Sequence, residues 1–231
     1  MKENNNTYAK SALTITTALT FVVAGFEVFQ SCANYKEGMN LLDFASYATG
    51  NINAYCLVLI LANLIFLPGA IMLYKSKGIS LKDDIYDKKT LGKDILIGIV
   101  LAIISSLISL VYLLINLGRT ELAFAGWHNL SLGTIILEVI ALVFVSGICK
   151  EIYFRGFARN FCSEALGETA ALFLFNVMFG ALDWFNIGQS FFVGLIWAYA
   201  YKRRKHLIVP MIAHGGMNLI AIVYYIITLE V

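Results

Sequence analysis

Seven apolar stretches, each close to the length that crosses a bilayer, follow one another along this sequence. A membrane-spanning helix needs about 20 predominantly apolar residues, and lipid offers no water to satisfy exposed backbone groups. The chain is 59% hydrophobic and only 14% charged, whereas a soluble domain is about 25% charged. Its polar residues are therefore too few to cover a globular surface. The sequence predicts an all-α, polytopic membrane helix bundle with about seven transmembrane helices.

No linker rich in Gly, Ser or Pro divides these stretches. The predicted spans are 11–29, 55–74, 95–117, 132–162, 169–185, 189–201 and 207–229. We therefore expect residues 1–231 to form a single membrane domain. No internal repeat is obvious, so nothing favours a transporter built from inverted repeats.

The basic residues of the loops predict how the chain is oriented. The loop 75–94 carries six lysines, and a basic tetrad, Lys202-Arg203-Arg204-Lys205, precedes the last span. Lys- and Arg-rich loops stay in the cytoplasm. The sequence thus predicts a multi-pass protein of the cell membrane with a cytoplasmic N-terminus and an external C-terminus. With a net charge of only +2, and with the basic residues lying in loops, we expect no nucleic-acid partner.

The strongest exception to the apolar pattern is a group of three charges in the fourth span: Lys150, Glu151 and Arg155. Each charge at membrane depth costs about 2.5–3.5 kcal/mol, so such residues usually have a partner or a function. Glu151 and Arg155 are spaced i, i+4, which places them on one helix face in the favourable order. Lys150 lies about 100° around the helix and needs a partner of its own.

Three further polar sites, which hold four residues, lie within the predicted spans. Asp183 lies about fifteen residues into the fifth span. His214 and Asn218 share a helix face in the seventh because they are spaced i, i+4. Glu138 lies near the outer end of the fourth span, where we expect its carboxylate to snorkel or to be hydrogen-bonded. An ion pair between Lys150 and Asp183 could be purely structural, and the spacing alone leaves that alternative open.

At these positions the chain resembles the CPBP family, the intramembrane metalloproteases that include the CAAX prenyl endopeptidases of the Rce type and the bacterial Abi proteins. The family pattern is Glu-Glu-x-x-x-Arg, then Phe-x-x-x-His, then His-x-x-x-Asn. The matching segments are Lys150-Glu151-Ile152-Tyr153-Phe154-Arg155, Phe179-Gly180-Ala181-Leu182-Asp183 and His214-Gly215-Gly216-Met217-Asn218. The resemblance covers about residues 132–218.

Two departures from the pattern bear on activity. Lys150 stands where the family has the first Glu, and Asp183 where it has the second-motif His. The resemblance assigns activation of the attacking water to these positions and oxyanion stabilisation to His214 and Asn218. A lysine ammonium has no lone pair with which to accept a proton. A salt bridge to Lys150 would also weaken Asp183 as a base.

Two functions follow from this resemblance. In the leading interpretation the chain is an inactive or weakly active protease that binds other membrane proteins as a regulator, scaffold or bacteriocin-immunity factor. In the alternative it is a CAAX-type intramembrane endopeptidase with Glu151 as general base and His214 with Asn218 as the oxyanion site. The partners would be the lipid bilayer and a membrane protein or peptide, prenylated or not. We expect no cofactor and no metal, because Lys150 would oppose a cation.

Overall fold

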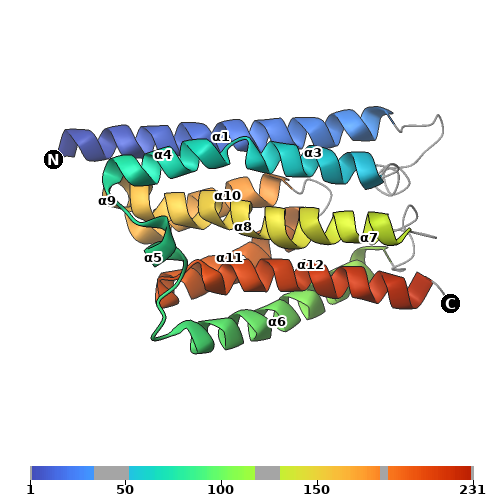
Figure 1. The fold of residues 1–231 in the computed structure, drawn as a ribbon. Helices are drawn as coiled ribbons and strands as arrows, with labels where there is room; N and C mark the ends of the chain where they lie inside the picture. The colour runs from blue at the N-terminus through green and yellow to red at the C-terminus, as the bar shows by residue number, and fades with distance from the viewer. Residues whose placement is uncertain (1, 34–51, 118–130, 183–186, 230–231) are drawn as a thin grey trace.

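The computed structural model describes residues 2–33, 52–117, 131–182 and 187–229. These residues form helices joined by short turns, and none of them lies in a strand. The predicted all-α fold is thereby confirmed. Figure 1 shows the long helices lying side by side in one bundle, with the N-terminus and the C-terminal end of the last helix at opposite ends.

The helical segments follow the seven predicted spans in order. The first three spans are formed by α1 (Lys2–Ala33), by α3 (Ile52–Leu64) with α4 (Leu67–Lys77), and by α6 (Leu91–Leu117). The short helix α5 (Leu81–Ile85) lies between α4 and α6. The fourth span is a long composite helix of α7 (Leu132–Glu138), η2 (Val139–Ser146), α8 (Gly147–Glu151), η3 (Ile152–Cys162) and α9 (Ser163–Leu166). The last three are α10 (Glu168–Leu182), α11 (Ile187–Arg204) and α12 (Ile208–Leu229). The segments η2 and η3 are π-helical, a wider form that is rare and often found at functional sites.

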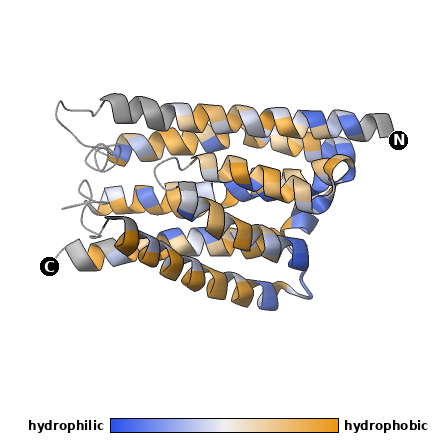
Figure 2. Cartoon of the chain, turned by 180° about the vertical axis from the view of Figure 1, so that it is seen from behind, coloured by the Kyte–Doolittle hydropathy of each residue, from blue (hydrophilic) through white to orange (hydrophobic). Residues whose placement is uncertain are grey.

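Several of these helices have the length and composition of membrane spans. Among the described residues, three segments are long and apolar enough to cross a bilayer: Ile52–Lys77, Leu91–Tyr112 and Leu132–Leu166. Two shorter helices, Glu168–Leu182 and Ile208–Tyr224, are also apolar. In Figure 2 hydrophobic residues cover most of the bundle, while hydrophilic ones gather at the end that holds the N-terminus. The chain is therefore a membrane protein.

Local sequence signals set several of the helix boundaries. The second span breaks ahead of Pro68, which stands in the first turn of α4, where a missing backbone N–H is tolerated. Gly78 ends α4 with φ 70°, the left-handed conformation that favours glycine. Ser131 caps α7 by accepting a hydrogen bond from the backbone N–H of Thr134 at 3.1 Å. Gly167, with φ 81°, separates α9 from α10.

The composite fourth helix lies at the centre of the bundle. η3 packs against α1 and α10, while η2 and α8 pack along α12. α8 and α12 approach closely at Gly147, where an added Cβ would lie 3.2 Å from the backbone of Gly215. Small residues at such crossings let membrane helices come together. This close approach brings the end of α8 against the middle of α12.

The charged loop 75–94 is folded onto the end of the bundle. Asp84 of α5 is buried and accepts hydrogen bonds from Tyr74, Tyr201 and Asn160 at 2.8, 2.8 and 2.7 Å. The backbone N–H of Leu207 donates to the Asp84 carbonyl at 2.8 Å. A single aspartate thus ties α5 to α4, η3, α11 and the start of α12.

Candidate functional site

Glu151, at the end of α8, is the centre of a buried polar cluster. Its side chain is 0% exposed, and His214 Nδ1 of α12 lies 2.8 Å from Glu151 Oε1. The second carboxylate oxygen, Oε2, lies 3.2 Å from Arg155 Nε, although the two atoms are not aligned for a hydrogen bond. An ionised carboxylate only accepts hydrogen bonds, so it orients the His214 ring with Nδ1 as the donor. Both oxygens of Glu151 therefore face a polar partner.

Arg155, one turn further along, is held by groups from two other helices. Its Nη2 donates to Asn176 Oδ1 of α10 at 3.2 Å and to the Gly194 carbonyl of α11 at 3.0 Å. Its guanidinium carbon lies 4.2 Å from the centroid of the Phe179 ring, a cation–π contact that gains strength away from water. Arg155 thereby connects η3, α10 and α11.

Gly194 allows this contact because it has no side chain. A Cβ at this position would clash with Asn176 Oδ1 and would lie 2.9 Å from both Arg155 Nη2 and Phe179 Cδ1. Asn176 in turn donates to the Phe191 carbonyl at 2.9 Å. The backbone of α11 therefore lies against the guanidinium with no room for a larger residue.

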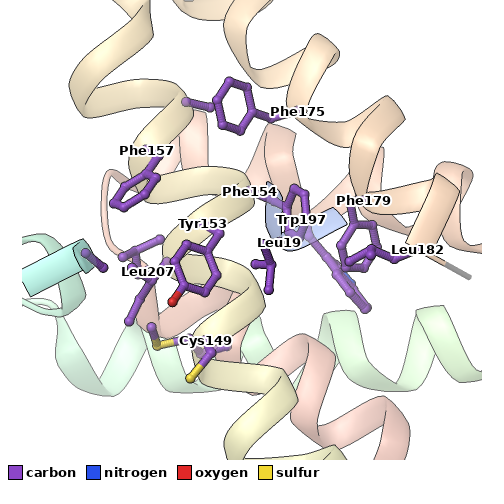
Figure 3. Packing of buried hydrophobic residues seen from close by; sticks show 14 of the residues in the cluster. Leu19, Cys149, Tyr153, Phe154, Phe157, Phe175, Phe179, Leu182, Trp197 and Leu207 are labelled. Carbon is purple, nitrogen blue, oxygen red and sulfur yellow. The ribbon is translucent and has the colours of Figure 1, made fainter. Parts of the chain in front are cut away.

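Aromatic rings enclose His214. The Trp197 ring stacks on the imidazole with centroids 4.7 Å apart and an interplanar angle of 25°, and Phe179 meets it edge-on at 5.6 Å. Trp197 Nε1 donates to Ser105 Oγ at 2.9 Å, which fixes the indole. Figure 3 shows Phe179 and Trp197 next to Phe154 of the fourth helix. The imidazole is thus packed in an apolar enclosure and held in one orientation by Glu151.

Asn218 lies one turn beyond His214 on α12, as its spacing predicts. Its Nδ2 donates to the Leu142 carbonyl of η2 at 2.8 Å, and the residue is only partly buried. The amide carries a second N–H, so this bond leaves a donor available. The structure therefore brings Glu151, Arg155 and His214 into direct contact and places Asn218 beside them against the backbone of the fourth helix.

Lys150 is partly exposed and forms no hydrogen bond or ion pair with any residue that the structure describes. Its charge acts on His214, as that of Arg155 does. Asp183, the predicted partner of Lys150, lies just beyond the end of α10 and outside the described residues. The Lys150–Asp183 ion pair therefore stays a prediction.

Glu138 does not snorkel, contrary to the first of the two expectations for it. Its side chain is 0% exposed, and neither carboxylate oxygen has a hydrogen-bond partner in the described part of the chain. Snorkelling requires a path to the interface, and this side chain instead lies between helices, close enough to Cys56 of α3 to interact electrostatically. In the sequence Glu138 lies near the end of its span, and no local pattern indicates that α3 packs against α7.

The described residues do not fit a metal centre. Among them no group of three or more His, Cys, Asp or Glu side chains lies close enough together to hold an ion. Glu151 and His214 contact each other, and Glu151 also faces Arg155. A catalytic zinc site uses three protein ligands with an open position for water. Asp183, the remaining side chain of the motifs that could contribute, lies outside the described residues, so the absence of a metal stays a prediction.

Some site residues were not predicted from the sequence. Asn176 accepts a hydrogen bond from Arg155, and Trp197, which donates a hydrogen bond to Ser105, stacks on His214. A weak signal existed for Asn176, a polar residue inside an apolar span and three positions before Phe179. Trp197 and Ser105 are of types common in membrane helices, so neither stood out.

Comparison with known proteins supports the motif assignment. Residues 132–220 match the family model described as Rce1-like, Type II CAAX prenyl endopeptidase. The match begins at α7, ends within α12 and so includes all three motif segments. Comparisons with curated proteins and with solved structures gave no match. The narrower likeness to the bacterial Abi proteins stays a prediction.

Proposed function

We propose a function on the premise that this chain belongs, through residues 132–220, to the Rce1-like family of type II CAAX prenyl endopeptidases. It binds a membrane protein or peptide in the cell membrane and has lost most or all of its protease activity. The binding serves as regulation, as a scaffold or as immunity to a bacteriocin. The observation that carries this proposal is Lys150, a partly exposed cation directly beside Glu151.

The arrangement of Lys150 and Glu151 is poorly suited to activating a water molecule. A general base must reach the proton it removes within about 2.6–3.2 Å, or through one water. Lys150 offers no lone pair when charged. Glu151 is fully buried, with one oxygen 2.8 Å from His214 Nδ1 and the other 3.2 Å from Arg155 Nε. Its carboxylate is thus engaged in holding the helices together.

The alternative is an active endopeptidase, and one observation favours it. Glu151 faces His214 directly, at 2.8 Å, so the predicted base and the predicted oxyanion donor lie in one buried cluster. Preorganised donors in a dry site can lower a barrier by several kcal/mol. In this reading the Glu151–His214 contact loosens when substrate and water enter, and Asn218 supplies its second N–H to the oxyanion.

A cleavage assay in liposomes separates the two functions. The substrates are a panel of prenylated and transmembrane peptides, and the proteins are this chain, Glu151→Gln and the double variant Lys150→Glu with Asp183→His. We expect no cleavage by this chain or by Glu151→Gln, and cleavage by the double variant, because it restores the family's water-activating pair. Glu151→Gln is preferred to Glu151→Ala because the amide fills the same volume beside Arg155.

One outcome decides against the proposal. Cleavage by this chain that Glu151→Gln abolishes would establish the protease with Glu151 as base. Thermal unfolding of each variant in detergent serves as the control, since a loss of activity counts only where the helices remain folded.

A further inference from the structure

Two of the four cations in the basic tetrad at the end of α11 are neutralised within the protein. Arg204 Nε lies 2.6 Å from Asp94 Oδ1, and Lys205 Nζ lies 2.6 Å from Glu168 Oε1. The two carboxylates belong to the first turns of α6 and α10, and both helices pack against α11. These ion pairs therefore join the end of α11 to the beginnings of its two neighbours.

The side chains of the other two cations, Lys202 and Arg203, bind only uncharged groups among the residues that the structure describes. Lys202 Nζ donates to Thr169 Oγ1 at 2.7 Å. Arg203 Nε donates to the Tyr199 hydroxyl at 3.0 Å, and its guanidinium carbon lies 5.2 Å from the centroid of the same ring. A hydroxyl satisfies one donor but leaves the positive charge uncompensated. Two adjacent cations thus keep both their charge and further N–H donors for another partner.

The contacts of the tetrad with its neighbours set its level in the bilayer. Asp94 directly precedes Ile95 and Leu96 of α6, which are 37% and 61% exposed and apolar. Thr169 is the second residue of the apolar helix α10. Because the last turn of α11 contacts both Asp94 and Thr169, it lies where the apolar parts of two other helices begin. This boundary is the level of the lipid headgroups.

An aromatic face leads from this turn toward the middle of the bilayer. Phe192, Tyr199 and Arg203 are spaced i, i+7 and i+11, so they lie along one side of α11. Phe192 and Tyr199 are 62% and 59% exposed. The opposite side of α11 is marked by Trp197, which is 0% exposed and stacks on His214. The side that carries Arg203 therefore faces lipid.

We propose that Lys202 and Arg203 form a binding site for an anionic phospholipid. The lipid phosphate lies between the ammonium and the guanidinium, and an acyl chain lies along Tyr199 and Phe192. Phosphate oxygens accept charge-assisted hydrogen bonds from both cations, and the planar guanidinium matches their geometry. Basic pockets at the ends of membrane helices bind anionic headgroups in this way. The site is separate from the buried cluster around Glu151, so the inference goes beyond the proposed function and does not rest on it.

The aromatic face favours a phospholipid over a soluble anion or an acidic peptide. Phe192 lies seven residues from Tyr199, which is about 10 Å along the helix and into the apolar region. A soluble anion at the two cations would not reach it. An anion attached to acyl chains occupies the cations and the aromatic face together.

Titration with two lipids that differ only in their headgroup tests the site. Dioleoyl phosphatidylglycerol and dioleoyl phosphatidylcholine are added to the full-length chain in a neutral detergent, and native mass spectrometry counts the lipids bound. The site variant is Lys202→Gln with Arg203→Gln. The matched control is Lys82→Gln with Lys88→Gln, which removes two exposed lysines from the loop 75–94 at the same end of the bundle.

We expect this chain to bind phosphatidylglycerol about tenfold more tightly than phosphatidylcholine, because two cations attract the anionic headgroup. The site variant should lose this preference and the control variant should keep it. An unchanged preference in the site variant would overturn the inference. An equal loss in both variants would also overturn it, because the preference would then reflect the overall positive charge of this end.

Two further probes identify the source of the anion. Glycerol 3-phosphate, a headgroup without acyl chains, should not displace phosphatidylglycerol at equal concentration, and its success would assign the site to a soluble phosphate. A polyglutamate peptide that displaces the lipid at equal concentration would assign the two cations to an acidic protein partner. Either displacement would overturn the assignment to a phospholipid.

Thermal unfolding shows whether the variants are comparable. In lipid-free detergent both double variants should unfold at the temperature of this chain, because they change side chains at the surface. Added phosphatidylglycerol should raise the unfolding temperature of this chain and of the control variant, but not that of the site variant, since a ligand of the folded state stabilises it. Arg203→Gln alone repeats the test with the bond from Lys202 to Thr169 intact, and a full lipid preference in this variant would contradict the site.

Discussion

The pair formed by Glu151 and Arg155 illustrates how a membrane protein keeps charge inside its core. Both side chains are 0% exposed, and burying two charges costs more than their mutual attraction returns unless further polar groups satisfy them. His214, Asn176 and the Gly194 carbonyl supply those groups. Each residue is therefore more costly to remove alone than together with its partner.

A double-mutant cycle measures this coupling. Glu151→Gln and Arg155→Met should each lower the free energy of unfolding by about 3–5 kcal/mol, because each leaves one buried charge unpaired. The double variant should lose less than the sum of the two. Denaturation in detergent gives the values, with Arg203→Met as the control. Arg203 is exposed, and its stacking and hydrogen bond in the described part of the chain are with Tyr199 of its own helix. Additive losses would show that the two charges do not depend on each other.

At the scale of the helical elements, α5 acts as a clasp on the end of the bundle. Asp84 is the buried carboxylate of α5, and it accepts three side-chain hydrogen bonds from three other elements. Arg159 Nη1 adds a charge at 3.6 Å from Asp84 Oδ1 and donates to the Lys205 carbonyl at 3.0 Å. Because α4, η3 and α11 end here, one side chain sets their relative positions.

Replacing Asp84 should therefore loosen this end of the bundle. Asp84→Ala leaves buried hydroxyl and amide donors without an acceptor, and we expect a loss of about 2–4 kcal/mol of unfolding free energy. Asp83→Ala is the matched control, because the neighbouring side chain is exposed, and should cost less than about 1 kcal/mol. Limited proteolysis of the loop 75–94 should rise in the first variant alone.

The pH dependence of this clasp has a defined sign. Burial raises the pKa of Asp84 above its usual value, in spite of the hydrogen bonds from Tyr201 and Tyr74. The folded state then binds the proton more tightly than the unfolded state, so this group lowers stability as the pH rises from about 3.9 through the raised pKa. Asp84→Asn should flatten that part of the stability curve. An unchanged curve would show that the group titrates normally.

At the scale of the whole molecule, the sequence predicted most of the architecture but only part of the site. Apolar length was sufficient to locate the helices, and spacing i, i+4 paired Glu151 with Arg155. The contact between Glu151 and His214 joins residues 63 positions apart, and only the family pattern suggested it. Asn176 binds Arg155 through a helix packing that no local pattern encodes, and Glu138 was misjudged because the cover supplied by α3 is likewise non-local.

The orientation of the molecule is the last prediction, and it depends on the same ends of the bundle. Basic side chains of the loop 75–94 and of the tetrad 202–205 lie together at one end, where Arg204 pairs with Asp94 at 2.6 Å and Lys205 with Glu168 at 2.6 Å. Each unpaired lysine there is attracted to the anionic inner leaflet by about 1 kcal/mol. The other end of the bundle holds the C-terminal end of α12 (Figure 1).

Reporter fusions test this orientation. Alkaline phosphatase, active only outside the cytoplasm, should be active when fused after Val231 and inactive when fused after Lys88. A green fluorescent protein that folds only in the cytoplasm should give the opposite pattern. Replacing Lys88, Lys89 and Lys93 with Gln should weaken the preference, since these charges retain the loop on the cytoplasmic side. Phosphatase activity after Lys88 in the unaltered chain would place α5, and with it the basic end of the bundle, on the outer face of the membrane.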